Sequence, residues 1–115
     1  MTPDSDESPR IRIKFYAPEW GNMLPFNTFC RNAKIAGYDG VEMALPLEAE
    51  ERRAVVDTLG EYGLELIGQY WQSLERDPDE HRRNYETYLR NLAAARPVLI
   101  NCQTGKDYFT PDQNN

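Results

Sequence analysis

PVLINCQTGKDYF, residues 97–109, is the stretch of sequence that decides the fold. It opens with an apolar run, 98–100, of the kind found in strands that are buried on both faces. It closes with a polar segment that contains Gly105 and the pair Lys106 and Asp107. An apolar strand that leads into such a loop is where α/β proteins place their binding and catalytic groups. The stretch therefore predicts an α/β fold with functional side chains after this strand.

Units of helix and strand precede this stretch along the chain. Alternation of apolar and polar residues predicts strands, and apolar stripes at helical spacing predict helices. The expected strands span 10–16, 38–45, 64–70 and the first part of 97–109, and the expected helices span 25–36, 47–62 and 77–96. Regular alternation of this kind predicts parallel strands joined by right-handed crossovers.

Local signals mark the ends of these helices. Asp77 followed by Pro78 is a strong helix start, and Gly37 and Gly63 are placed as helix-ending glycines. Residues 110–113, Thr-Pro-Asp-Gln, form a capping box that starts a further helix near the last residue of the sequence. We therefore expect residues 10–115 to be part of a larger α/β domain that is truncated at the start of its fourth helix.

Composition narrows the class of protein. The chain has 115 residues, a net charge of -6 and a pI of about 4.8, which disfavours a nucleic-acid-binding surface because such surfaces need clustered cations. No apolar run approaches the ~18 residues of a membrane span, and the acidic segment 1–9, expected to be a disordered tail, is no signal peptide. Cys30 and Cys102 are expected to be buried, reduced thiols, which favours a cytoplasmic protein.

One side of the expected sheet carries polar residues. In a (β/α)8 barrel, alternate side chains of each strand point to the helices and to the interior, and the active face lies at the strands' carboxyl ends. If the more apolar set faces the helices, the interior set comprises Lys14, Tyr16, Glu42, Gln69, Asn101 and Gln103. One cation, one carboxylate and several amides suit a polyhydroxylated small molecule.

Structural roles for these residues remain open alternatives. Glu42 could pair with Lys14, the two glutamines could satisfy loop backbone groups, and Lys106 with Asp107 could form a solvated pair. Trp20 is either a packing anchor or a wall over a pocket, and Trp71 likewise packs or stacks on a ligand. The single histidine, His81, lies between Glu80 and Arg82 and is expected at the surface.

Established catalytic patterns are missing from the sequence. Glu42 is the only well-placed carboxylate, whereas a catalytic metal needs three or four convergent ligands. We find no Ser/His/Asp set and no glycine-rich phosphate loop. No metal ligand or catalytic residue is therefore assigned.

Three segments resemble the xylose isomerase-like TIM barrels: GYDGVE at 37–42, GLELI at 63–67 and INCQTGKDYF at 100–109. That superfamily includes sugar isomerases, sugar-phosphate isomerase/epimerases, hydroxypyruvate isomerases and endonuclease IV-type enzymes. The first segment resembles the family's second strand and the last its fourth strand and following loop. The resemblance implies that residues 10–115 form the N-terminal half of a TIM (β/α)8 barrel.

The resemblance also implies a chemistry. The full-length parent would bind a divalent metal (Mn, Mg, Zn or Co) through Glu, Asp and His of later strands, and would move a proton between sugar carbons through an enediolate. What carries over to this chain is the substrate-facing half, namely Trp20, Glu42, Gln69, Gln103 and Lys106. Gln69 and Gln103 stand near positions where relatives have histidine ligands, and this departure disfavours an endonuclease IV-like nuclease.

We therefore expect the N-terminal portion of a sugar (phosphate) isomerase/epimerase that acts on a sugar or hydroxy-carbonyl compound and is inactive as this fragment. The alternative is a non-catalytic half-barrel that binds sugars or assembles with another chain. A four-stranded half-barrel has two open edges, and these could pair with a second copy to form a homo-oligomer.

Overall fold

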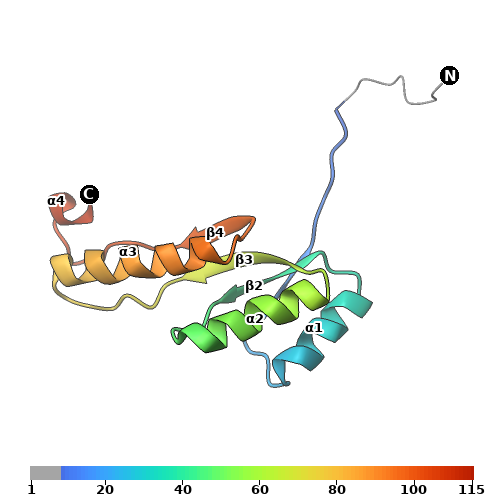
Figure 1. Cartoon of the computed structure of the whole chain (residues 1–115). Helices are drawn as coiled ribbons and strands as arrows, with labels where there is room; N and C mark the ends of the chain where they lie inside the picture. Colours follow the sequence, from blue (N-terminus) through green and yellow to red (C-terminus); the bar gives the residue numbers. More distant parts are fainter. Residues whose placement is uncertain (1–8) are drawn as a thin grey trace.

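Strands and helices alternate along the whole of the described chain, residues 9–115, in the computed structural model (Figure 1). The strands are β1 (Tyr16–Pro18), β2 (Gly40–Ala44), β3 (Glu65–Tyr70) and β4 (Leu99–Cys102), and the helices are α1 (Phe26–Ile35), α2 (Ala49–Glu61), α3 (Pro78–Ala94) and α4 (Pro111–Asn114). This is the expected order of elements. Apart from Pro9, the tail expected to be disordered lies outside the described residues.

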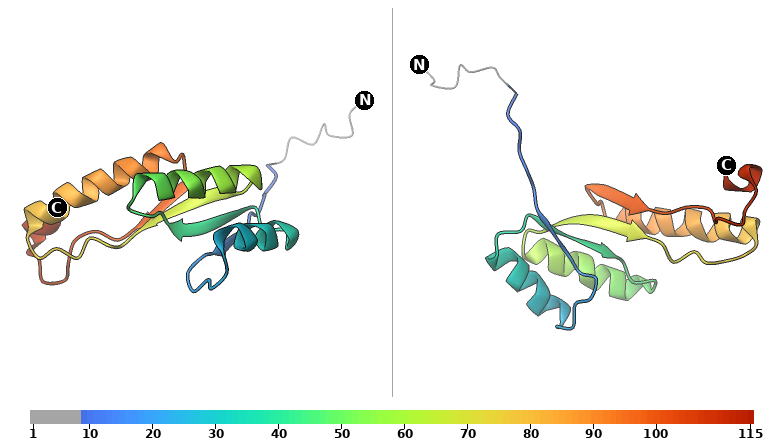
Figure 2. Two further views of the ribbon diagram at one scale, coloured as in Figure 1. Left: turned by 60° about the horizontal axis from the view of Figure 1, so that its bottom comes forward. Right: turned by 180° about the vertical axis from the view of Figure 1, so that it is seen from behind.

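The four strands form one parallel sheet in the order β1-β2-β3-β4. Consecutive strands are neighbours, and each connection between them contains a helix. Figures 1 and 2 show α1, α2 and α3 along the same face of this twisted sheet. The predicted α/β class and the predicted parallel strands are therefore confirmed.

A single apolar core lies between the sheet and its helices. Alternate residues of β2 and β3 point into it, as Val41, Met43 and Leu66 do, and they meet buried residues of the three long helices. Gly68 is buried on the same side, against Leu92 of α3. Because strand side chains alternate, the residues between them lie on the opposite face, which no described helix covers.

The predicted helix signals are present in the structure. Asp77 caps α3 by accepting a 3.0 Å hydrogen bond from the backbone N–H of Glu80. Thr110 and Gln113 form the expected capping box at the start of α4. Gly37 follows α1 with a φ of 93°, a backbone conformation that glycine adopts without steric cost. Most predicted boundaries are one or two residues too wide, as in α2, which begins at Ala49 after the capping side chain of Glu48.

The first predicted strand is wrong over most of its length. Residues 10–16 were expected, but β1 begins only at Tyr16, and the preceding residues project away from the sheet (Figure 1). Ile11, Ile13 and Phe15 are 91%, 69% and 62% exposed. Tyr16 pairs with Gly40, the first residue of β2, and Phe15 still forms hydrogen bonds with Asp39 and Gly40. Residues 9–13 extend beyond the start of β2 and have no strand beside them in the described structure.

The two cysteines differ in their surroundings. Cys30 of α1 is completely buried, as expected, but Cys102 is exposed, which contradicts the prediction of two buried thiols. Cys102 ends β4, the edge strand of the sheet, and an edge strand lacks a neighbour on one side. Among residues 9–115, no helix combines the length and the apolar character needed to cross a bilayer.

Candidate functional site

Three polar side chains from neighbouring strands meet on the open face of the sheet. Glu42 of β2, Gln69 of β3 and Asn101 of β4 share this face because Ala44 pairs with Gln69 and Gln69 pairs with Asn101. The Gln69 amide donates a 2.7 Å hydrogen bond to Oε2 of Glu42, and the Asn101 amide donates a 3.0 Å bond to the same oxygen. We call these three residues the Glu42 cluster.

Glu42 is the charged centre of this cluster. Hydrogen bonds from Gln69 and then Asn101 lower the pKa of Glu42, and partial burial opposes them only in part. The side chain is therefore a carboxylate at neutral pH. Its second oxygen, Oε1, has no hydrogen-bond partner among residues 9–115, so it can accept a hydrogen bond from a ligand hydroxyl.

A cavity of about 360 Å³ opens beside the Glu42 cluster, at the carboxyl ends of β3 and β4. Its volume lies within the range of small-molecule pockets. The indole of Trp71, which is 51% exposed, supplies an aromatic surface. The lining residues are Gln69, Tyr70, Trp71, Leu74, Asn101, Gln103 and Lys106. Amides, an aromatic ring and one cation therefore converge on one cavity.

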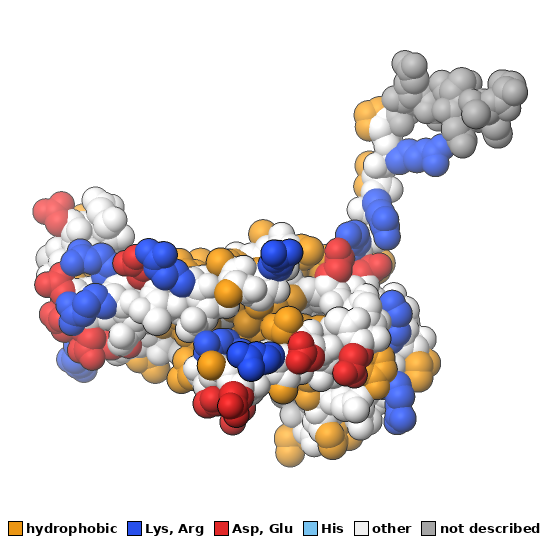
Figure 3. Space-filling view, in the orientation of Figure 1, with side chains coloured by type: hydrophobic (Ala, Val, Ile, Leu, Met, Phe, Trp, Pro, Cys, Tyr) orange, Lys and Arg blue, Asp and Glu red, His pale blue; other side chains and the backbone are white. Residues whose placement is uncertain are grey.

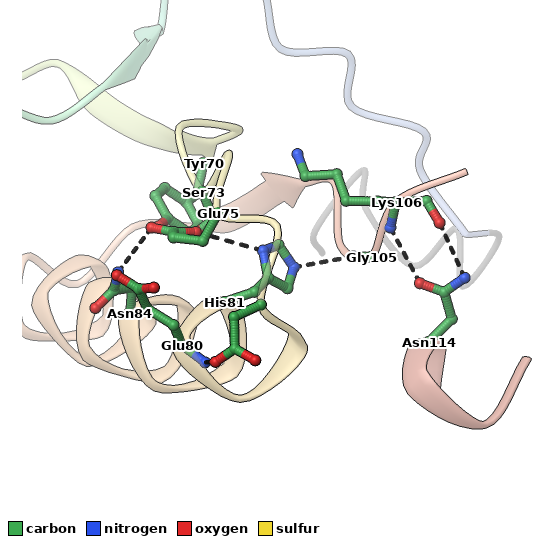
Figure 4. Close-up of polar contacts among 10 residues, drawn as sticks. Tyr70, Ser73, Glu75, Glu80, His81, Asn84, Gly105, Lys106 and Asn114 are labelled. Atoms are coloured by element: carbon green, nitrogen blue, oxygen red, sulfur yellow. Dashed lines mark hydrogen bonds and ion pairs between the residues drawn. The ribbon is translucent and has the colours of Figure 1, made fainter. Parts of the chain in front are cut away.

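The loop that contains Lys106 is fixed by side chains of two helices (Figure 4). The backbone N–H of Gly105 donates a 3.2 Å hydrogen bond to Nε2 of His81 in α3. The Asn114 side chain of α4 accepts a 3.0 Å bond from the Lys106 N–H and donates a 3.1 Å bond to the Lys106 carbonyl. Figure 4 shows the Lys106 side chain extending away from Asn114. The loop backbone is thus held while the lysine side chain remains directed into the cavity.

His81 is buried, with 6% of its surface exposed, and the prediction of a surface histidine is wrong. Its Nδ1 lies 3.6 Å from Oε2 of Glu75, and its ring packs edge-on against Phe109. The sequence contained a signal for this position: His81 stands four residues before Tyr85, so it continues the buried stripe of α3 toward the helix start. Because its neighbours Glu80 and Arg82 are charged, His81 was assigned to the surface instead of to that stripe.

Glu75 acts on the loop indirectly, because its carboxylate lies beside His81, which binds the loop. Burial raises the pKa of its carboxyl, but the hydrogen bond from Asn84 and the interaction with His81 outweigh burial and lower the pKa overall. The Asn84 amide donates a 2.7 Å hydrogen bond to Oε1 of Glu75, and Oε2 of the same carboxylate faces the His81 ring. The carboxylate therefore connects α3 to the segment that precedes it.

A second polar group lies at the amino end of the sheet. Lys14 forms a 3.0 Å ion pair with Glu65, and the Tyr16 hydroxyl donates a 2.9 Å hydrogen bond to the same carboxylate. The contact with Lys14 and then that with Tyr16 lower the pKa of Glu65. The expected alternative, an ion pair between Lys14 and Glu42, is therefore wrong, and Glu42 remains free of cationic partners in the described structure.

The structure brings together four of the five residues that the sequence selected. Gln69, Gln103 and Lys106 line the cavity, and Glu42 is joined to it through Gln69. Trp20 does not line the cavity, and its 86% exposure excludes the packing role that was the alternative. Sequence reasoning did not select Asn101 or Trp71 as site residues, although alternation had placed Asn101 on the polar side.

A larger cavity of about 680 Å³ lies along α3 beside α4. Its cations, Arg82 and Arg90, already form ion pairs with Asp79 and Glu86 on the same helix. Its walls come from α3, from Thr104 and Gly105 in the loop after β4, and from α4, and no residue of a described strand lines it. The smaller cavity has the better-placed polar groups, so we treat it as the candidate site.

The described residues do not fit a divalent metal. Residues 9–115 contain no group of three or more His, Cys, Asp or Glu side chains arranged to hold an ion. The Glu42 cluster offers one carboxylate and two amides whose N–H groups point at it, and N–H groups are not metal ligands. No chemical step through a metal is assigned to these residues.

Comparison with known proteins identified no relative: no family model matches the chain, and neither a curated protein nor a solved structure matches it significantly.

Proposed function

We propose that this chain forms the substrate-binding half of a xylose isomerase-like (β/α)8 barrel, with a polyhydroxylated ligand bound at the Glu42 cluster. The observation that carries the proposal is the hydrogen-bonded group of Glu42, Gln69 and Asn101 beside a cavity at the carboxyl ends of the strands. The parent reaction would be isomerisation or epimerisation of a sugar or sugar phosphate.

The arrangement of the sheet supports the half-barrel. Parallel strands in consecutive order, with their helices on one face, are the arrangement of successive units in a (β/α)8 barrel. In such a barrel the helix-free face becomes the interior, and ligands bind at the carboxyl ends of the strands. The Glu42 cluster occupies that position.

The chemistry of the cluster supports a ligand rich in hydroxyl groups. Oε1 of Glu42 can accept hydrogen bonds, and the amide oxygens of Gln69 and Asn101 have no hydrogen-bond partner among residues 9–115, so they too can accept from a ligand. Sugars present hydroxyl groups on adjacent carbons, and the aromatic surface of Trp71 can stack on the apolar face of a sugar ring. One carboxylate with two flanking amide acceptors therefore matches adjacent hydroxyls.

The described residues support a proposal of binding but not one of turnover. The enediolate chemistry of the parent enzymes uses a divalent metal, and residues 9–115 do not fit one. We therefore propose that the chain alone binds its ligand without converting it. Turnover of a ketose by the purified chain with added Mn²⁺ would contradict this part of the proposal.

The binding test uses side-chain amide signals as local probes. Nuclear magnetic resonance spectra of isotope-labelled protein are recorded during titration with D-fructose, a neutral ketose. We expect the NH₂ signals of Gln69 and Asn101 to shift, and the shifts to disappear in Glu42→Ala. Glu65→Ala is the matched control, because Glu65 lies on the same face of the sheet at the opposite end. Equal binding by wild type and Glu42→Ala would overturn the proposal.

The projecting segment, residues 9–13, favours a second candidate, an assembling half-barrel. Its exposed apolar residues Ile11 and Ile13 alternate with the cations Arg10 and Arg12, within a chain of net charge -6 (Figure 3). Both β1 and β4 are edge strands of the described sheet. A second copy of the chain could pair with these edges and cover the apolar residues.

Analytical ultracentrifugation tests this candidate directly. A stable dimer that dissociates in Ile13→Lys would support assembly through the projecting segment. Ile35→Lys is the control, because Ile35 is exposed to a similar degree on α1. A monomer at every concentration would exclude it.

A further inference from the structure

We propose that His81 is a pH-dependent anchor for residues 104–115, the segment that follows β4. The neutral imidazole binds this segment to the rest of the chain, and uptake of one proton by the ring releases it. The inference goes beyond the proposed function, because it concerns how the loop that carries Lys106 is held and not which ligand binds.

His81 makes two contacts with the segment. The backbone N–H of Gly105 donates a 3.2 Å hydrogen bond to Nε2 of His81, and this is the only hydrogen bond that joins residues 104–115 to the rest of the described chain. The Phe109 ring, which is buried, packs edge-on against the imidazole with the ring centres 5.7 Å apart. One side chain of α3 therefore provides both a polar and an apolar contact to the segment.

The other contacts of the segment do not attach it firmly. Asn114 bonds the backbone N–H and carbonyl of Lys106, but both residues belong to the segment, so these bonds fix its shape and not its position on the protein. The Arg76 guanidinium lies 5.8 Å from the centre of the Tyr108 ring, which is exposed. Such a contact at the surface contributes little. Attachment of the segment therefore depends mainly on His81.

The hydrogen bond from Gly105 determines which imidazole nitrogen carries the hydrogen atom. A neutral imidazole has one donor and one acceptor nitrogen, and Nε2 is the acceptor here, so the hydrogen atom is on Nδ1. Nδ1 faces Oε2 of Glu75 across 3.6 Å, on the opposite side of the ring from Gly105 (Figure 4). This distance is too long for a hydrogen bond, and both atoms are buried without another partner within residues 9–115.

Uptake of a proton changes both sides of the ring. A proton from water that binds Nε2 converts this nitrogen from an acceptor into a donor, which then faces the N–H donor of Gly105. The hydrogen bond to the segment is lost. At the same time the imidazolium gains attraction to the Glu75 carboxylate. Charging His81 therefore exchanges a contact with the segment for a stronger contact with the residues before α3.

The ionisable groups beside the ring allow this change between about pH 5 and 8, where histidine side chains ordinarily titrate. Burial alone would raise the pKa of Glu75, but hydrogen bonds, first that from Asn84, and the nearby His81 lower it overall, so Glu75 stays a carboxylate. Burial, and then the Cys102 thiol, raise the pKa of Tyr85, so its hydroxyl stays neutral. The charged residues that line the adjacent cavity together with His81 are Asp79, Arg82, Glu86, Arg90 and Asp112.

Release of the segment would change the candidate site. Lys106 lines the cavity of about 360 Å³, and Thr104 and Gly105 line the cavity of about 680 Å³. Each cavity would therefore lose part of its wall when His81 becomes charged. In this way the protonation state of one buried side chain controls the shape of both cavities.

The experiment follows the ring and the segment together. Nuclear magnetic resonance spectra of the isotope-labelled whole chain are recorded without ligand from pH 8 to pH 5. The sequence contains a single histidine, so the ring signals report His81 directly. We expect the Gly105 amide signal to shift with the same midpoint as the ring. The protection of this amide from hydrogen exchange, relative to an unstructured chain at the same pH, should fall about tenfold. A Gly105 amide that is unchanged while the ring becomes charged would overturn the inference, as would a ring that stays neutral until the whole chain unfolds.

Two variants assign the transition to the ring. His81→Gln keeps a side-chain acceptor that does not titrate, so the protection of Gly105 should no longer depend on pH. Glu75→Gln is the matched variant, because it keeps an acceptor for Asn84 but removes the charge that favours the imidazolium. Its transition should occur at a lower pH than in wild type. A transition that persists in His81→Gln, or one that does not move in Glu75→Gln, would contradict the inference.

Discussion

The side-chain amide of Gln69 donates a 2.7 Å hydrogen bond to Oε2 of Glu42, from one parallel strand to the next. Asn101 donates to the same oxygen from the strand beyond. One carboxylate oxygen thus connects three strands on the open face of the sheet. This contact stabilises the sheet as well as the candidate site, so the Glu42 cluster can be tested without knowledge of the ligand.

Glu42 should make the stability of the protein depend on pH. Because the pKa of Glu42 is lowered in the folded protein, its contribution is complete above the ordinary glutamate value of about 4.3 and is lost as the pH falls through the folded-state pKa. We expect Glu42→Gln to unfold with a lower free energy than wild type at neutral pH, by about 1 kcal/mol. The difference should shrink as the pH falls below about 4.

Urea denaturation at a series of pH values measures this effect. Glu61→Gln provides the control, because Glu61 is exposed at the end of α2 and its side chain makes no hydrogen bond within residues 9–115. A constant difference between wild type and Glu42→Gln at every pH would show that the carboxylate charge is not what stabilises the cluster.

His81 should control the order of the loop that carries Lys106. Its removal in His81→Ala leaves the Gly105 N–H without its acceptor and leaves a gap beside Phe109. We expect a loss of about 2 kcal/mol in the free energy of unfolding and faster hydrogen exchange at the Gly105 amide. His81→Gln keeps an acceptor on the side chain and should recover part of the protection. Exchange at Gly105 that is unchanged in His81→Ala would contradict this role.

Alternation within the strands was sufficient to predict the composition of the open face. Period-two spacing placed Glu42, Gln69 and Asn101 on one side, and the structure confirms this because neighbouring parallel strands pair in register. Spacing along one strand does not determine the stagger between strands, however. That stagger aligns Gly40 with both Tyr16 and Glu65, which places Lys14 within reach of Glu65. The partner of Lys14 is therefore Glu65, and the open alternative that paired Lys14 with Glu42 is wrong.

Other features depended on contacts that a local pattern cannot show. The apolar residues of 10–16 alternate as in a strand, but their neighbour β2 begins only at Gly40. His81 lies among charged residues, yet it is buried because the loop after β4 folds back over the start of α3. In both cases a segment distant in sequence determines whether the residue is buried, and a local pattern does not reveal that contact.

Gly40 should tolerate no larger side chain. A Cβ atom there would lie 2.3 Å from the carbonyl oxygen of Glu65 and 2.7 Å from the ring of Tyr16. Since the first of these is backbone, strand β3 itself would have to move. We expect Gly40→Ala to lower the free energy of unfolding by about 1–3 kcal/mol or to prevent folding.

Gly60 provides the matched substitution for that test. A Cβ there meets nothing within 4 Å, and the residue lies within α2. Gly60→Ala should stabilise the protein by about 0.5–1 kcal/mol, because alanine restricts the unfolded chain. Thermal unfolding followed by circular dichroism compares the two variants, and equal effects would contradict the close approach at Gly40.

The two thiols should react with very different rates in the folded protein. Cys30 is fully buried, and burial raises the pKa of its thiol to about 11, so it presents almost no thiolate at neutral pH. Cys102 is exposed at the end of β4. We expect a chromogenic disulfide reagent at about pH 7.5 to modify Cys102 quickly, and Cys30 only after the chain unfolds. Cys102→Ser should abolish the fast phase, whereas Cys30→Ala should leave it intact. The slow phase reports opening of the core around α1, so its rate should rise with the urea concentration. Equal reaction rates of both thiols without denaturant would show that Cys30 is not enclosed as the structure indicates.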